Sequence, residues 1–268
     1  MPPLSSHQST QTTKMLLIGD SGAGKTGSLA SLVRAGFNLR IADLDNGLDV
    51  LQNVLGRDAE RVIYQTLTDP MRNINGKLVP RAATVWQRLM KLLDGWKTET
   101  EDLGAISTWG SSDVLAIDSL TFVCNAAMNF VLSMNARLGQ QPHQSDWYQA
   151  QQLVESLLQM LYDENIKCNV VVNCHITYIG EDNGPQHGYP ASLGKALSPK
   201  IGRYFNSILM AKTTGVGQNE RHKLLTRSTS MIELKNTAPL QVKAEYPIET
   251  GLADYFAAIR QPPVKSAT

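Results

Sequence analysis

The sequence lacks several features that would assign it to a membrane, to secretion or to bulk binding of nucleic acid. No apolar run reaches the roughly 18 residues of a membrane-spanning helix, and residues 1–13 lack the basic-then-apolar layout of a signal peptide. The net charge at pH 7 is only +1, so any nucleic-acid contact must come from local patches. The chain has only three cysteines, an odd number without metal-type spacing, which indicates reduced, buried thiols and a cytoplasmic protein.

What is present fits one folded domain of ordinary size. The chain has 268 residues, and an apolar fraction of 42% is enough to build a full core. We expect a disordered N-terminal lead at 1–13, a folded domain at 14–260 and a flexible tail at 261–268.

The strongest motif is GDSGAGKT at residues 19–26, which matches the phosphate-binding loop pattern of a glycine, four residues and Gly-Lys-Thr. Small residues let the backbone curl until successive N–H groups point at phosphate oxygens. In this pattern Lys25 reaches the β- and γ-phosphates and the Thr26 hydroxyl ligates Mg²⁺. The residues expected to contact the nucleotide are Gly19, Asp20, Ser21, Gly22, Ala23, Gly24, Lys25, Thr26 and Gly27.

The flanking sequence supports this interpretation. Residues 14–18 form a short apolar run typical of a buried strand, and residues 27–34 have helical spacing. The loop would therefore join a strand to a helix N-terminus, where the helix dipole favours an anion. A chance match would not need these flanks, so the sequence predicts a protein that binds a nucleoside triphosphate.

The rest of the chain alternates between expected strands and expected helices. The further strands are predicted at 38–43, 61–65, 113–119, 169–175, 207–211, 223–227 and 241–244. The further helices are predicted at about 81–96, 120–132, 147–162 and 252–259. Residues 66–80 carry two turn signals and predict a loop or a small hairpin. This alternation implies an α/β fold with a mainly parallel central sheet flanked by helices, and the close-set late strands predict an antiparallel C-terminal extension.

Carboxylates end two of these strands. Asp118 ends an apolar strand that we expect beside the loop, where it can hold Mg²⁺ directly or through water; the alternative is a helix cap. Ser119 follows where many ATPases have a catalytic Glu, so the base is expected elsewhere. The turn after the second strand offers Asp43, Asp45 and Asp49, and we expect that strand to neighbour the loop. We assign Asp45 to orienting the attacking water; the alternative is that these acids cap a helix or face solvent.

His175 ends another apolar strand, so it should emerge at the same edge of the sheet as the phosphates. Its imidazole can donate to the γ-phosphate or to a nearby water; an ordinary polar residue at a strand end is the alternative. Polar stretches at about 135–146 and 178–200 follow the strands that carry Asp118 and His175. Long loops in a compact domain are usually functional or disordered.

The second stretch, with its C-terminal border, carries cations and rings that suit single-stranded nucleic acid, whose bases stack on aromatic side chains. The candidate DNA-binding residues are Lys195, Lys200 and Arg203, with Tyr178 and Tyr189 as stacking groups. A merely solvated loop is the alternative. Lys235 lies in an expected hairpin, where a cation can stabilise transition-state charge at a neighbouring subunit's γ-phosphate; a surface lysine is the alternative.

Together these motifs resemble the RecA-like ATPase core, and most closely the phage-encoded RecA-like nucleotide-binding proteins, a group that includes single-strand-annealing recombination proteins. The resemblance covers about residues 14–257. It is carried by GDSGAGKT at 19–26, IADLDNGLDV at 41–50, VLAIDS at 114–119 and VVVNCH at 170–175. Asp-Ser after the apolar strand is typical of RecA-like proteins, whereas AAA+ proteins usually have Asp-Glu.

The resemblance implies roles for particular residues. It places the catalytic acid at Asp45, where RecA itself has Glu, and the γ-phosphate sensor at His175. It places the two DNA-binding loops near 135–146 and 178–200, and a lysine that acts in trans at Lys235. The catalytic set implied is therefore Lys25, Asp45 and His175, with Mg²⁺ held by Thr26 and Asp118.

The sequence thus predicts a RecA-like domain that binds and hydrolyses ATP with Mg²⁺ and acts on single-stranded DNA in recombination, annealing or repair. Expected partners are single-stranded DNA, further copies of the chain in a ring or short filament, and a single-strand-binding protein, with no membrane. The expected location is the cytoplasm, that of a bacterial host if the chain is phage-encoded. Two alternatives stay open: a nucleotide-switched interaction module such as a helicase loader or scaffold, and a small-molecule or nucleotide kinase. The absence of arginine from residues 178–200 counts against the kinase.

Overall fold

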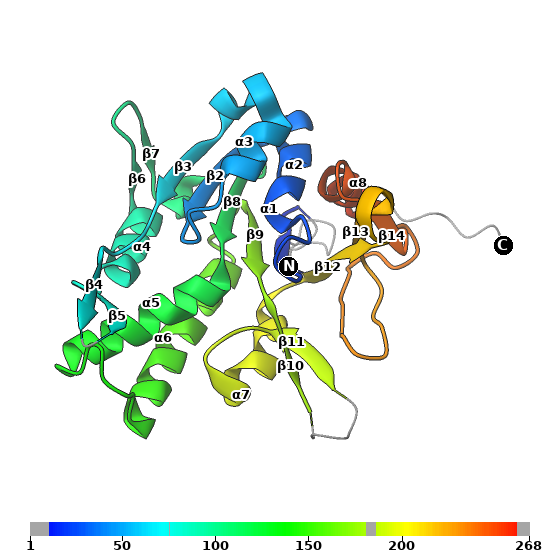
Figure 1. Ribbon diagram of the computed structural model, residues 1–268. Coiled ribbons are helices and arrows are strands. Elements are labelled where there is room, and N and C mark those ends of the chain that lie inside the picture. Colours follow the sequence, from blue (N-terminus) through cyan, green and yellow to red (C-terminus); the bar gives the residue numbers. More distant parts are fainter. Residues whose placement is uncertain (1–10, 75, 181–185, 262–268) are drawn as a thin grey trace, which may run out of the picture.

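The computed structural model describes residues 11–74, 76–180 and 186–261, and a large sheet forms its centre (Figure 1). The eight strands lie in the order β14-β13-β12-β1-β9-β8-β2-β3. They are β1 (Lys14–Ile18), β2 (Asn38–Asp43), β3 (Ile63–Thr66), β8 (Asp113–Asp118), β9 (Asn169–Cys174), β12 (Ser207–Thr214), β13 (Arg221–Leu225) and β14 (Glu245–Pro247). The strands from β12 to β3 in this order are parallel, and β13 and β14 are antiparallel at one edge. The predicted mainly parallel sheet with an antiparallel C-terminal extension is confirmed.

Helices cover both faces of the sheet, which is why its central strands are continuous apolar runs (Figure 1). One face is covered by α4 (Val85–Asp94), α5 (Leu120–Met134) and α6 (Gln144–Tyr162). The other face is covered by α1 (Lys25–Ser28), α2 (Ala30–Arg34), α3 (Asp49–Leu55) and α8 (Gly251–Ile259). Alternate side chains of a strand enter the two cores: Val170 and Val172 pack under α5 and α6, and Val171 packs under the other layer.

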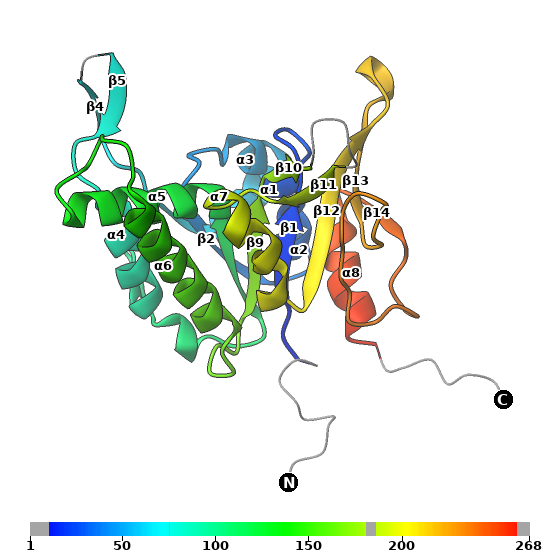
Figure 2. The ribbon, with the colours of Figure 1, turned by 90° about the horizontal axis from the view of Figure 1, so that it is seen from below.

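Three two-stranded hairpins extend from this body. The predicted loop or hairpin at 66–80 is a hairpin of β4 (Met71–Ile74) and β5 (Lys77–Pro80), which projects from the domain in Figure 2. A second, small hairpin pairs β6 (Trp96–Lys97) with β7 (Asp102–Gly104). The third pairs β10 (Ile176–Ile179) with β11 (His187–Pro190).

The third hairpin corrects the prediction of a long polar loop at 178–200. After β11 this stretch continues into α7 (Gly194–Leu197) and the 3-10 helix η5 (Ser198–Tyr204). Contacts distant in sequence order it, because Gly188 N donates to Met231 O at 2.8 Å and Ala191 N donates to His175 O at 2.7 Å. The pattern of residues within the stretch cannot reveal such partners, so the sequence did not predict the hairpin.

Other predicted boundaries also moved, for local reasons. Residues 241–244 are not a strand, since the amides of Gln241 and Val242 turn back to Ala238 O, and the strand β14 follows them. The helix predicted at about 81–96 begins at Val85 because the Asp69 carboxylate accepts the amide hydrogens of residues 84 and 85. The helix predicted at 27–34 is divided into α1 and α2.

The predicted disordered lead falls largely on residues 1–10, and the predicted tail on 262–268, which lie outside the described residues. The ordered domain begins before Lys14, because Thr12 and Thr13 are buried and Thr13 N donates to Asn169 Oδ1 at 3.0 Å. Within the described residues, no helix combines the length and the apolar character needed to cross a bilayer.

Candidate functional site

The loop at residues 19–26 is confined between two strands. Gly19 N donates to Cys174 O, at the end of β9, at 3.1 Å. On the other side, a Cβ added to Gly19 would lie 2.7 Å from the backbone oxygen of Ala211 on β12, so no larger residue fits there. Gly22 and Gly24 have φ angles of 76° and 92°, a left-handed conformation that glycine adopts without steric cost. The curled backbone needed to surround a phosphate is therefore already formed.

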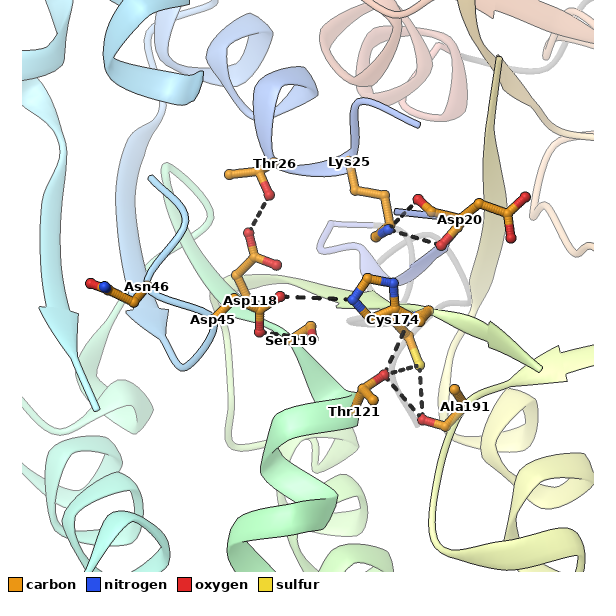
Figure 3. Close-up of polar contacts among 12 residues, drawn as sticks. Asp20, Lys25, Thr26, Asp45, Asn46, Asp118, Ser119, Thr121, Cys174 and Ala191 are labelled. Carbon is orange, nitrogen blue, oxygen red and sulfur yellow. Dashed lines mark hydrogen bonds and ion pairs between the residues drawn. The ribbon is translucent and has the colours of Figure 1, made fainter. Parts of the chain in front are cut away.

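Lys25 lies across the mouth of this loop (Figure 3). Its side chain is buried, and Nζ donates to the carbonyl oxygens of Gly19 and Asp20, both at 2.8 Å. Burial lowers the pKa of Lys25, and the negative charge of Asp118 opposes that shift. The ammonium is thus held beside the loop by two neutral acceptors, which phosphate oxygens can replace as stronger, charged partners.

Thr26 and Asp118 form the contact that defines the site. Thr26 Oγ1 donates to Asp118 Oδ2 at 2.6 Å (Figure 3). We expected Asp118 on the strand next to the loop, but β9 lies between β1 and β8. The Thr26 side chain reaches across this one-strand gap. Asp118 is 3% exposed, and burial raises the pKa of its carboxyl, with the hydrogen bond from Thr26 opposing.

Asp45 lies in the site, but the strand before it does not lie where we predicted. Strand β2 does not neighbour β1; it pairs with β8 and β3 at the far side of the sheet. The turn after β2 folds back because Leu44 N and Asp45 N both donate to Asp118 O, at 2.6 and 3.2 Å. Ser119 Oγ then donates to Asp45 Oδ1 at 3.0 Å. Burial raises the pKa of Asp45, so two carboxyls with raised pKa values lie close together.

The other two acids of that turn lie in different surroundings. Asp43 is buried and accepts hydrogen bonds from Asn46 N at 2.8 Å and from Thr66 Oγ1 at 3.1 Å. Asp49 begins α3 and lines a groove between α3 and β3. Of the three, it is Asp45 whose carboxylate meets the residues around Asp118.

His175 closes the site on the side of β9. Its Nε2 lies 3.9 Å from Asp45 Oδ2, which is too far for a hydrogen bond and is an ion pair only when the imidazole is protonated. Burial lowers the pKa of His175, and the positive charge of Lys25 acts in the same direction. His175 N donates to Thr121 Oγ1 at 3.3 Å. The structure therefore brings Lys25, Asp45 and His175, the three predicted catalytic residues, into one cluster with Asp118.

Asn173 is a further residue of the site that the sequence reasoning missed. On β9 it pairs with Leu17 of β1, and the register of β9 with β8 places it beside Asp118 on the same face. The side chain is 1% exposed, and neither its Oδ1 nor its Nδ2 has a hydrogen-bond partner among the described residues. It still lies near enough to favour the charged form of Asp118 and so to lower that pKa. The available signal was the single amide in the apolar run VVVNC.

The donor set fits a magnesium ion. Mg²⁺ prefers hard oxygen ligands and is usually bound through one or two protein groups plus phosphates and water. Thr26 and Asp118 supply a hydroxyl and a carboxylate, and Asn173 adds an unpartnered buried amide that a metal-bound water would satisfy. No group of three or more His, Cys, Asp or Glu able to hold a metal occurs in the described part of the chain.

The remaining predicted residues lie outside this cluster. Lys195 on α7 and Lys200 on η5 are exposed. Arg203 is paired, since its Nη2 lies 2.7 Å from both Glu155 Oε1 and Tyr204 Oη. Lys235 bonds through its backbone to Ile208, near the start of β12, and its Nζ donates to Phe205 O at 2.8 Å. The DNA-binding and trans-acting roles of these side chains stay predictions.

Comparisons with known proteins place this geometry in a family. The family model described as AAA domain matches residues 11–238. No curated protein matches the chain. Similar solved structures include the flagellar accessory protein FlaH from Methanocaldococcus jannaschii, with 10% identity, a TM-score of 0.42 and coverage of 89% of this chain and 87% of that one. A KaiC-like protein from Pyrococcus horikoshii OT3 has 12% identity, a TM-score of 0.41 and coverage of 88% and 84%.

Proposed function

This chain belongs to the AAA domain family, and from that premise we propose that it binds ATP with Mg²⁺ and hydrolyses it. The fold is that of a RecA-like P-loop ATPase, and the family implies nucleotide binding. The observation that carries the proposal is the 2.6 Å hydrogen bond between Thr26 and Asp118, beside the buried ammonium of Lys25. These three groups are held in place for a metal-bound triphosphate before one arrives.

Each side chain has a part in that reaction. Lys25 exchanges the carbonyls of Gly19 and Asp20 for oxygens of the β- and γ-phosphates, and the N–H groups of the loop surround the β-phosphate. Thr26 and Asp118 would hold Mg²⁺, and the ion would neutralise charge on the phosphates. The electrostatic field that stabilises the transition state is therefore largely preorganised.

Asp45 is proposed to orient the attacking water. Its Oδ1 is occupied by the Ser119 hydroxyl at 3.0 Å, which fixes the carboxylate and leaves Oδ2 directed toward His175, 3.9 Å away. A water between Asp45 Oδ2 and the γ-phosphate would fit this opening, with His175 as a second contact to the water or the phosphate. Because the His175 pKa is lowered, the imidazole is neutral at pH 7 and can both donate and accept.

The direct test is ATP hydrolysis by the purified chain with Mg²⁺ and with EDTA, beside the variant Lys25→Ala. We expect the variant to lose hydrolysis, and EDTA to abolish it in the unchanged chain. Lys195→Ala, an exposed lysine on α7, is the matched control and should hydrolyse normally. Unchanged turnover in Lys25→Ala would refute the proposal.

We further propose that ATP binding is coupled to single-stranded DNA in recombination, annealing or repair. The resemblance to phage recombination proteins supports this through the sequence motifs, and the β10–β11 hairpin gives it a physical route. That hairpin begins directly after His175, and His175 O accepts a hydrogen bond from Ala191 just beyond β11. A movement of His175 on nucleotide binding would therefore reach both ends of the hairpin.

The measurement is ATP hydrolysis with single-stranded DNA, with duplex DNA and without DNA. Stimulation by single strands alone would support the coupling. Hydrolysis indifferent to DNA would refute it and would leave an ATPase that acts on another partner. Tight ATP binding without turnover would favour an interaction module such as a helicase loader. Size-exclusion chromatography with and without ATP tests the proposed ring or short filament, and pull-down tests a single-strand-binding protein.

A further inference from the structure

A cavity of about 470 Å³ lies on the opposite side of the phosphate loop from Asp118. Four segments form its walls: the loop itself, strand β12, the β10–β11 hairpin, and residues 229–232, which pack against the hairpin. Figures 1 and 2 both place the hairpin beside β12. The volume of the cavity lies within the usual range of ligand sites, roughly 300–1,000 Å³. The ATPase chemistry described above makes no use of it.

The lining combines an apolar floor with an exposed ring and a cation. Met210 and Ile232 form the floor, at 5% and 4% exposure. Tyr178, 44% exposed, stands at the wall formed by the hairpin. Lys212 of β12 is exposed and has no hydrogen-bond or ion-pair partner in the described ranges of the chain. Such a site offers an apolar face, a stacking ring and one positive charge, and Asp20 of the phosphate loop adds a carboxylate on the side of the nucleotide site.

The position of Lys212 is unfavourable for the fold alone. It lies directly opposite Lys223 in the antiparallel pair of β12 and β13, and like charges in that arrangement destabilise a sheet. Lys223 is paired with Glu245, but Lys212 is left without an anion. A ligand that carries its own phosphate would give the unpaired Lys212 an anion, which explains a lysine at this position beside the phosphate loop.

We propose that this cavity binds one nucleotide unit of a single strand, with the base stacked on Tyr178 over the Met210 floor and its phosphate paired with Lys212. A base in a duplex cannot enter such a site, whereas an unpaired base can be splayed out and stacked on an aromatic ring. The inference rests on the proposed coupling to single-stranded DNA and names where the strand would be held. It keeps Tyr178, a stacking group that the sequence also suggested, and replaces the cations, since Lys212 lines the cavity and Lys195, Lys200 and Arg203 do not.

The cavity also gives the strand a direct contact with the nucleotide site. Asp20, Ser21 and Ala23 of the phosphate loop line it. The carbonyl of Asp20 is one of the two groups that hold the Lys25 ammonium, at 2.8 Å. A base lodged against Asp20 would restrict the same backbone that releases Lys25 to the phosphates. We therefore expect the strand and ATP to influence each other's binding.

The test measures binding of a fluorescent oligo-dT to the full chain over a range of salt concentrations. Tyr178→Ala should weaken binding about 5- to 100-fold, the loss of one stacked base. Lys212→Gln should reduce the slope of log affinity against log salt by about one phosphate contact. The matched controls are Tyr148→Ala, another largely exposed tyrosine, and Lys167→Gln, an exposed lysine just before β9, and both should leave affinity and slope unchanged.

The outcomes separate this site from the function on which it rests. Normal oligonucleotide binding by a chain with both cavity substitutions would overturn the site and leave the DNA function standing. Failure of the unchanged chain to bind any oligonucleotide would refute the DNA function as well. Loss of dTMP binding in the double variant, without any oligonucleotide binding by the unchanged chain, would assign the cavity to a free nucleotide and overturn the single-strand part. ATP binding and the melting temperature, measured on each variant, exclude a general loss of fold.

Discussion

Replacing Asp118 by Asn should make the ligand-free protein more stable while removing its response to magnesium. Asp118 is 3% exposed, and burial raises the pKa of its carboxyl above the ordinary value of 3.8. The charged form is therefore unfavourable in the fold when no metal is bound. An amide of the same shape keeps the hydrogen bond from Thr26, which lies at 2.6 Å, without carrying the charge.

The size of the effect follows from two opposing contributions. Burying a carboxylate costs several kcal/mol after relaxation, on the order of 3–5 kcal/mol when it lacks a full partner. A hydrogen bond to a charged group stabilises it by about 1.5–3 kcal/mol. The nearby charge of Lys25 stabilises the Asp118 carboxylate further, and the charge of Asp45 destabilises it. We expect a net gain of about 1–2 kcal/mol in the free energy of unfolding, which raises the melting temperature by about 2–8 °C for a domain of this size.

The pH dependence has a definite sign. Below pH 3.8 the carboxyl is protonated in both the folded and the unfolded chain, so the substitution changes little. As pH rises above 3.8 the unfolded chain ionises first, and the unchanged protein loses stability relative to Asp118→Asn. The advantage of the variant is complete above the raised pKa of the folded protein, at neutral pH.

The assay is thermal unfolding in EDTA, and then with ATP and Mg²⁺. The control is Asp113→Asn at the other end of β8. Burial tends to raise the pKa of Asp113, but hydrogen bonds from Arg40, Asn38 and Gly110 outweigh burial and lower that pKa. Asp113→Asn should therefore destabilise, by about 1–3 kcal/mol. Adding Mg²⁺ to ATP should stabilise the unchanged chain and not Asp118→Asn. A lower melting temperature for Asp118→Asn in EDTA would refute the claim that burial governs this carboxylate.

Substitutions at four residues test other parts of the site. Asp45→Asn should reduce hydrolysis without weakening ATP binding. Because burial raises the pKa of Asp45, the activity of the unchanged enzyme should fall on the acid side at a pH above 3.8. A pH–rate profile should show this fall for the unchanged enzyme and not for the variant. Thr26→Val should lose Mg²⁺-dependent hydrolysis and Thr26→Ser should keep it, as measured by turnover against Mg²⁺ concentration. Gly19→Ala should cost about 1–3 kcal/mol and abolish ATP binding, because its Cβ meets Ala211 O at 2.7 Å. Gly22→Ala should cost only about 1–2 kcal/mol in thermal unfolding, since its Cβ meets nothing within 4 Å and only the φ of 76° is strained.

The sequence was informative wherever a local pattern determines the geometry. The loop at 19–26 needs small residues in a fixed spacing, and an apolar strand that ends in Asp118 emerges at the carboxyl edge of a parallel sheet. Each feature depends on a run of consecutive residues, and both were predicted. His175 follows the same logic, and the structure places it within 3.9 Å of Asp45.

The order of strands across the sheet could not be predicted in the same way. Strand β2 was expected beside the loop, but β9 and β8 separate it from β1. Asp45 reaches the site through hydrogen bonds to the backbone of Asp118, which depend on a pairing of β2 with β8 that consecutive residues do not encode. The position of the hairpin at 176–190 and the role of Asn173 belong to the same class. Gly188 bonds to residues 231 and 232, and Asn173 lies beside Asp118, so each depends on neighbours far away in sequence.

The place of β1 in the sheet has a consequence for how the protein is made. Of the eight strands of the large sheet this one is synthesised first, but its two neighbours, β9 and β12, come from residues 169–174 and 207–214. Strands β2, β3 and β8 can pair with one another much earlier, since they lie within residues 38–118. We therefore expect the phosphate loop to form late in synthesis, because both strands that flank β1 are made long after it and closing such long loops is slow. A truncated chain that ends before residue 207 would carry the whole GDSGAGKT motif but lack β12, one of the two strands that flank β1, and we expect it to fail to retain ATP.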